Sequence, residues 1–158
     1  MKETIHREGK VNVKVRRWNA DAGTHGVWEQ IGESKNLLTK AGIDVTCAQV
    51  YGTPQDTSAS FVALTVDSGA PSTSDTEVSA EITTGGLTRA VGTYAHTAGQ
   101  ATCTITKTFT ATAQFTAVQK AGLFDAVAAG NLIHENTFSS TNLLTNDQIQ
   151  ITWTQTIS

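Results

Sequence analysis

The stretch "ATCTITKTFTATA", residues 101–113, carries the strongest pattern in the chain. Every even position from 102 to 112 is Thr, and the odd positions are mostly apolar: Ala101, Cys103, Ile105, Phe109 and Ala111. A period of two residues places alternate side chains on opposite faces of a β-strand. We therefore predict a strand with one buried face and one face of hydroxyls. Lys107 interrupts the buried face and indicates either a strand end or a contact across an interface.

The neighbouring segments of the second half continue this β pattern. Residues 82–96 are predicted to pair antiparallel with 101–113 through a turn at 96–100. "KAGLFDA" and "NLIHENTFSS", which begin at Lys120 and Asn131, are predicted to form a second hairpin joined by residues 127–130. The closing stretch "DQIQITWTQTIS" alternates in the same way and is predicted to be a strand. Its apolar side carries Ile149, Ile151, Trp153 and Ile157.

The first half is predicted to begin with a hairpin over residues 10–32. "KVNVKVRRW", residues 10–18, alternates Val with polar residues, "NADAGTHG" has a turn composition, and "VWEQIGES" is strand-like. Residues 58–66, "SASFVALTV", are predicted to be a short strand. In the segment that follows, Asp75 is expected to cap a short helical turn with Val78 and Ile82 on one side.

One segment has apolar residues near helical spacing. In "SKNLLTKAGIDVTCAQVYG", residues 34–52, Ser34 or Asn36 is available as N-cap and Gly52 as the stop. We predict a helix over 36–50. Together these elements predict a mainly β chain, an antiparallel, jelly-roll-like β-sandwich with one main α-helix.

Length and composition agree with one β-rich domain over residues 1–158. Within it we distinguish an N-terminal basic arm and hairpin (1–32) from a helix plus β-sandwich (33–158). Only 16% of the residues are charged, and Thr, a β-branched residue that suits strands, is frequent. The net charge of −3 predicts no attraction to nucleic acid or to an anionic membrane.

The sequence also indicates where the chain is made and how its thiols behave. The first ten residues are polar and charged, which argues against a signal peptide, and no apolar run approaches the length of a membrane span. We expect synthesis in a cytoplasm as a soluble protein. Cys47 and Cys103 lack metal-binding spacing and are predicted to be buried thiols rather than a disulfide.

No catalytic motif is found in the sequence, so we predict a protein that is not an enzyme and has no cofactor or metal. The four histidines stand in separate segments, and the adjacent His134 and Glu135 point to opposite faces of a predicted strand, which suits no acid–base couple. Asp67, Asp75 and Glu77 lie in one loop. A Ca²⁺ site there is an alternative to ordinary turn chemistry.

Basic and aromatic residues gather near the N-terminus and suggest a docking surface. The predicted partner-binding residues act through charge complementarity and aromatic anchoring. They are Lys10, Lys14, Arg16, Arg17, Trp18 and Trp28. Two other interpretations are a solvated strand face and a platform for stacking nucleic-acid bases.

Several segments together resemble a family of small virion proteins of tailed bacteriophages. "NLLTKAGIDVTCAQVYG" resembles the family's helix opening, "FVALTVDSGAPSTSDTEVSAEI" its strand running into Gly and Ala-Pro, and "KAGLFDAVAAGNLIHENTF" its hairpin. "LLTNDQIQITWTQTIS" is similar to its closing strand. The likeness covers residues 36–158 in the same order. One departure is that Ala63–Leu64 continue into "TVDSG", where such proteins often have a Gly-Thr-Gly turn.

The resemblance implies a β-rich component of the virion, synthesised in the host cytoplasm. We expect a head decoration or cement protein that binds the major capsid protein or other virion proteins and forms a homo-oligomer such as a trimer. The alternatives are a tail-tip or tail-fibre protein that contacts the host surface and, more remotely, a glycan-binding module in which Asp67, Asp75 and Glu77 converge.

Overall fold

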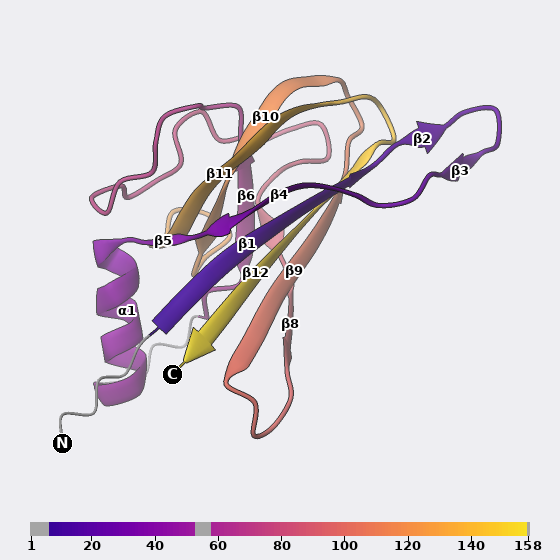
Figure 1. The fold of residues 1–158 in the computed structure, drawn as a ribbon. Helices are drawn as coiled ribbons and strands as arrows, with labels where there is room; N and C mark the ends of the chain where they lie inside the picture. Colours follow the sequence, from indigo (N-terminus) through magenta and orange to yellow (C-terminus); the bar gives the residue numbers. More distant parts are fainter. Residues whose placement is uncertain (1–6, 53–57, 158) are drawn as a thin grey trace.

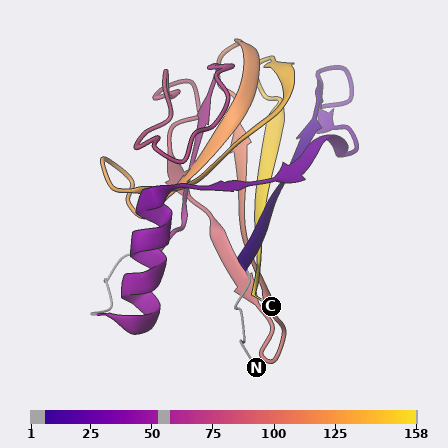
Figure 2. The ribbon, with the colours of Figure 1, turned by 60° about the vertical axis from the view of Figure 1, so that its left-hand side comes forward.

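The computed structural model describes residues 7–52 and 58–157, which form two five-stranded antiparallel sheets packed face to face (Figures 1 and 2). A short two-stranded ribbon and one helix complete the fold. The predicted fold class, an antiparallel β-sandwich with one main helix, is therefore confirmed.

Sheet 1 contains the alternating strands that the sequence predicts, in the order β4-β1-β12-β9-β8. These are β1 (Arg7–Arg16), β4 (Glu29–Lys35), β8 (Thr93–His96), β9 (Thr102–Thr110) and β12 (Gln148–Ile157). The register places Val11, Trp153 and Ile105 opposite one another across three strands. All three side chains are buried, so the odd positions of these strands form the inner face of sheet 1.

Sheet 2 is built on the hairpin of β10 and β11, in the order β5-β11-β10-β6-β7. Its strands are β5 (Leu37–Leu38), β6 (Phe61–Thr65), β7 (Ala90–Val91), β10 (Phe115–Phe124) and β11 (Leu132–Leu143). Leu64, Ala121 and Leu123 point inward and join the valines of β1 in one core. The core thus lies between the two sheets, as the period of two residues requires.

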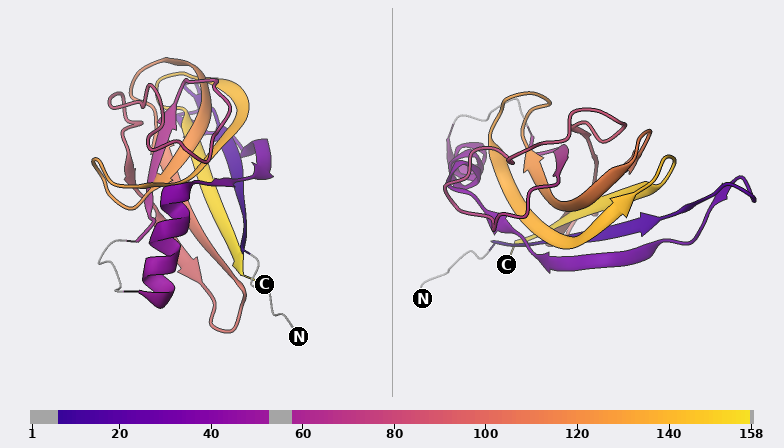
Figure 3. Two further views of the ribbon diagram at one scale, coloured as in Figure 1. Left: turned by 90° about the vertical axis from the view of Figure 1, so that its left-hand side faces the viewer. Right: turned by 90° about the horizontal axis from the view of Figure 1, so that it is seen from above.

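The hairpin of β1 and β4 continues past the sandwich into a projecting arm, which we define as residues 17–28. Its ribbon pairs β2 (Trp18–Asn19) with β3 (Thr24–His25). Seen from above, the arm extends from one end of the sandwich, while α1 lies at the opposite end (Figure 3). The predicted hairpin over 10–32 is confirmed.

The helix starts four residues later than predicted. α1 spans Lys40–Tyr51, not 36–50, and its N-cap is Thr39 rather than Ser34 or Asn36. Leu37 and Leu38 pair instead with Glu135 and His134 on β11 as strand β5. The Thr39 hydroxyl accepts a hydrogen bond from Gly42 N at 3.0 Å. Tertiary pairing of the two leucines therefore delays the helix, while Gly52 ends it as predicted.

The predicted partner of β9 over 82–96 is only partly correct. Thr93–His96 pairs with β9, but Ala90–Val91 pairs with β6 in the other sheet. The chain passes between the sheets at Gly92, where an added Cβ would lie 2.7 Å from Ile105 Cγ2. Close approach of the backbone to the core at this corner requires glycine.

Two smaller predictions are wrong. The segment around Asp75 forms no helical turn, and the Asp75 carboxylate accepts a hydrogen bond from Ser72 N at 2.8 Å instead. Ile157 alternates with the buried Ile149, Ile151 and Trp153 as predicted, and it is 61% exposed because it stands at the end of β12. Both cysteines are free as predicted, but Cys47 is exposed and Cys103 is only half-buried.

Candidate functional site

Three of the predicted partner-binding residues share the outer face of sheet 1. Lys10, Lys14 and Arg16 alternate on β1 with the buried valines, so all three point away from the core. Their neighbours on β12 and β9 are Thr and Gln residues. We call this surface the open face: the outward side chains of β1, β12 and β9.

The open face is held together by side-chain hydrogen bonds between strands. Thr106 and Thr152 hydroxyls lie 3.2 Å apart, and the Gln150 amide donates to the Thr108 hydroxyl at 3.0 Å. Neutral hydroxyl and amide groups shed water at a lower cost than charged groups do. The open face is therefore chemically suited to docking against a polar surface.

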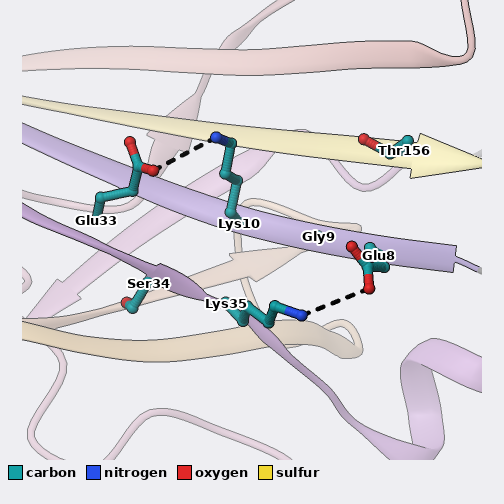
Figure 4. A pocket seen from close by; sticks show the side chains of 7 residues that line it. All are labelled: Glu8, Gly9, Lys10, Glu33, Ser34, Lys35 and Thr156. Atoms are coloured by element: carbon teal, nitrogen blue, oxygen red, sulfur yellow. Dashed lines mark hydrogen bonds and ion pairs between the residues drawn. The ribbon is translucent and has the colours of Figure 1, made fainter.

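At the β1–β4 edge, two ion pairs border a hollow of about 440 Å³ (Figure 4). Lys10 lies 3.4 Å from Glu33, and Lys35 lies 3.5 Å from Glu8. A hydrogen bond from Asn12, and then Lys10, lower the pKa of Glu33. All four side chains are at least 46% exposed, and such surface pairs contribute little to stability.

Arg16 and Trp28 act as a unit at the arm end of the open face. The Arg16 guanidinium lies 4.6 Å from the centre of the Trp28 ring, and its Nε donates to Gln148 at 2.7 Å. Lys14, in contrast, makes no hydrogen bond or ion pair with any residue in 7–52 or 58–157. Lys14 is thus the cation of this face that is available to a partner.

Arg17 and Trp18 make contacts within the fold at the base of the arm. The Arg17 guanidinium lies 2.8 Å from the Asp147 carboxylate, which also accepts from Trp18 N at 2.8 Å and from Leu144 N. Burial alone would raise the pKa of Asp147, but these hydrogen bonds and Arg17 lower it overall. The Trp18 ring packs edge-on against His25. Both residues have roles within the fold, and their binding of a partner stays a prediction.

A second candidate site lies on the outer face of sheet 2. Lys120 and Gly122 alternate on β10 with the core residues Ala121 and Leu123, so they point outward, and Glu135 stands opposite Gly122 on β11. The segment 66–81 covers this face, because its Val78 packs in a small apolar cluster with Phe124, Leu132 and Ala63. Polar side chains are thereby buried outside the main core.

Beside that cluster, acidic residues line a cavity of about 450 Å³, which we call the acidic pocket. Asp67, Asp75 and Glu77 reach it from the covering segment, and Lys120 and Glu135 reach it from the sheet. The alternative prediction of a glycan-binding or Ca²⁺ site requires Asp67, Asp75 and Glu77 to converge. The structure does bring them together around one cavity.

Lys120 is the central cation of the acidic pocket. Its Nζ lies 2.5 Å from Asp67 Oδ2 and 3.2 Å from Glu135 Oε1. Burial lowers the pKa of Lys120, but its hydrogen bonds to the two carboxylates outweigh this effect and raise it overall. The bond to Lys120 lowers the pKa of Asp67. Lys120 is therefore charged, and its charge is shared between two acids.

Glu135 has the most perturbed carboxyl group of the pocket. Burial, and then a hydrogen bond with the neighbouring Asp75, raise its pKa to about 7, although Lys120 acts in the opposite direction. A strongly perturbed carboxyl in a cavity indicates a functional site on physical grounds. Sequence reasoning missed Lys120 and Glu135; the signal was a charged residue beside an apolar run on each strand, Lys120 before residues 121–124 and Glu135 after residues 132–133.

The orientation of the adjacent His134 and Glu135 can be compared with the prediction. His134 stacks on Trp153 in the core while Glu135 faces the pocket, so the prediction that the two point to opposite faces is confirmed. No group of three or more His, Cys, Asp or Glu residues within the described ranges is arranged to hold a metal ion. None of the helical residues described here forms a segment long and apolar enough to cross a bilayer.

Comparisons with family models, with curated proteins and with solved structures find no match to this chain. The family resemblance noted in the sequence therefore stays a prediction. The two outer faces and the arm are the features of the structure that bear on function.

Proposed function

We propose that this chain is a non-enzymatic virion structural protein of a tailed bacteriophage, a head decoration protein that docks on the assembled capsid and stabilises it. The observation that carries the proposal is the open face of sheet 1 together with the projecting arm. Neutral hydroxyl and amide groups cover two neighbouring strands, β12 and β9, beside the cations of β1, and the arm continues from the same sheet. This combination suits adhesion to an extended surface better than it suits enclosure of a small substrate.

The docking contact is formed by the residues of the open face. Lys14 supplies an available positive charge, and Arg16 holds Trp28 in a stacked position beside it. Aromatic and arginine side chains held in place before binding are the usual anchors of protein interfaces. Binding to the assembled lattice, and not to free subunits, stabilises that lattice by mass action without any chemistry.

The test is co-sedimentation with emptied heads and, separately, with tails of the phage or prophage that encodes the chain. We expect saturable binding to heads, weakened several-fold by Lys14→Glu. The control is Lys40→Glu, which makes the same charge change at an exposed position of α1. Lys14 is preferred over Arg16 because replacing Arg16 also breaks its bond to Gln148.

Other outcomes would assign other functions. Binding to tails or to host cells alone would contradict decoration and support a tail-tip or tail-fibre protein. Equal loss of binding in both variants would indicate an effect of net charge and not a docking site at Lys14. Binding to neither particle would reject the virion proposal.

A further inference from the structure

The charges of the acidic pocket do not balance. Four carboxyl groups, those of Asp67, Asp75, Glu77 and Glu135, line the same cavity as one ammonium group, that of Lys120. Lys120 contacts two of the four. The pocket therefore carries an excess of negative charge inside a partly enclosed space, where electrostatic interactions are stronger than in water.

The deepest of these carboxyl groups has an oxygen without a donor. The Glu135 side chain is 1% exposed and its Oε1 contacts Lys120, but its buried Oε2 accepts no hydrogen bond from the residues of 7–52 or 58–157. Neutral Glu135 is hydrogen-bonded to the neighbouring Asp75 carboxylate, to which its own proton is donated. Ionised Glu135 has lost this proton, and the two adjacent carboxylates then lack a donor, so this arrangement favours a cationic donor that can enter the pocket.

We propose that the acidic pocket binds one organic cation, an ammonium or guanidinium group. Such a group brings both the positive charge and the N–H donors that the pocket lacks, and a guanidinium can bond two carboxylates at once. This inference stands on the other outer face of the sandwich and does not depend on the docking of the open face.

Other ligand classes fit the pocket less well. A metal ion is disfavoured because Lys120 already occupies the centre of the acids and no metal-holding group is found in the described part of the chain. A sugar ring is disfavoured because the lining contains no aromatic side chain on which the ring could stack. The cavity, about 450 Å³, has room for a guanidinium group on its side-chain stem.

Binding of the cation is coupled to the proton of Glu135. The pKa of this carboxyl is raised to about 7, and a bound cation favours its ionised form. Asp67, Asp75 and Glu77 on the covering segment and Lys120 on β10 are the other charged groups facing it. Because cation binding is linked to the ionisation of Glu135, the affinity for the cation rises with pH. The increase between pH 5.5 and pH 8 is up to about thirtyfold.

Two sources of such a cation are chemically equivalent. One is a lysine or arginine side chain of a second copy, for which Lys14 on the opposite outer face is available. The other is a free amine in solution. Both present the same group to the pocket, so the experiment first tests the chemistry and then the source.

The first experiment is a titration of the ¹⁵N-labelled full chain with methylguanidinium chloride, which is followed by amide chemical shifts. NaCl at matched ionic strength is the reference. We expect saturable shifts centred on Asp75, Thr76, Glu77 and Glu135, with tighter binding at pH 8 than at pH 5.5. Asp75→Asn and Glu135→Gln place an amide donor in the pocket and are expected to weaken binding at least about tenfold. Asp44→Asn removes an equal charge from exposed α1 and is the control.

Unsaturated shifts that NaCl reproduces, or equal affinity in Asp75→Asn and the native chain, would overturn the proposal. The spectra themselves report whether each variant is folded. The second experiment is sedimentation equilibrium at pH 5.5 and pH 8. Self-association that strengthens at pH 8 and is reversed by methylguanidinium supports a second copy as the source, whereas a monomer that binds methylguanidinium saturably supports a free amine.

Discussion

The outer faces of the two sheets differ in how their charged side chains are exposed. On the open face of sheet 1, Lys10 and Glu33 pair while both are about half exposed. On the outer face of sheet 2, Lys120 and Glu135 pair while both are at least 96% buried beneath the segment 66–81. The same chemical pair therefore stands in two different environments within one sandwich.

This difference in exposure predicts that charged residues on one face affect binding and those on the other face affect stability. Exposed charges interact mostly with water and contribute little to folding, so they are free to meet a partner. Buried charges depend on each other, and losing one leaves the other unpaired at a high cost. We accordingly expect substitutions on the open face to change binding, and substitutions in the acidic pocket to change stability and its pH dependence.

The largest expected effect is that of Lys120→Met. This change leaves Glu135 and Asp67 without their cation, and we expect a loss of about 3–5 kcal/mol in the free energy of unfolding at pH 8. At pH 5, where Glu135 retains its proton, the loss is expected to be smaller. Urea unfolding at both pH values measures it. The matched control, Lys14→Met on the open face, is expected to change stability by less than about 0.5 kcal/mol, and equal losses would remove the contrast between the faces.

The second prediction concerns the pH dependence of stability. The pKa of Glu135 is raised from 4.5 to about 7 in the folded chain. Its contribution to stability is thus fully present below pH 4.5 and is lost as the pH rises through 7, by about 3 kcal/mol in total. Glu135→Gln cannot titrate, so the difference in unfolding free energy between native chain and variant should change over pH 4.5–7. A constant difference across this range would contradict the burial of an ionisable Glu135.

The third prediction concerns the base of the arm. Asp147→Asn weakens the bonds to Arg17, Trp18 N and Leu144 N, and we expect it to cost about 2 kcal/mol at pH 7. Because the pKa of Asp147 is lowered by folding, this contribution is present above its unfolded value and disappears as the pH falls through the folded value. Thermal unfolding at pH 7 and pH 3 measures both. Asp21→Asn, an exposed change in the arm, serves as control.

The smallest expected effect on stability is that of Thr106→Val with Thr152→Val on the open face. The hydroxyl pair is half exposed and its replacement keeps the β-branched shape, so we expect a change within about 0.5 kcal/mol. Binding to heads should nevertheless fall if this face docks. Unchanged binding together with unchanged stability would show that the Thr rows are not part of the docking contact.

Much of the fold could be predicted from the sequence because alternation is a local signal. The Thr and apolar positions around Ile105, the valines of β1 and the apolar side of β12 identify strands and their inner faces without reference to any partner. The helix and its Gly52 stop were also predictable. Of the predicted partner-binding residues, Lys10, Lys14 and Arg16 lie together on one face for the same local reason.

The boundaries and the acidic pocket could not be predicted because they depend on distant segments. Leu37 and Leu38 become a strand only because β11 offers an edge, and the partner of Ala90 is decided by the corner at Gly92. Arg17 is engaged only because Asp147, 130 residues away, lies beside it. Propensity is weak over two or three residues, so tertiary pairing overrides it.

The sequence by itself determined that this chain forms strands with one apolar and one polar side, which must pack as layers to bury the apolar sides. Only the tertiary structure decided which polar side remains in contact with water. The segment 66–81 covers one sheet and leaves the other open, so Glu135 titrates near neutral pH while Glu33 stays ionised. The physical reason is desolvation, which depends on what covers a side chain and not on its neighbours in sequence.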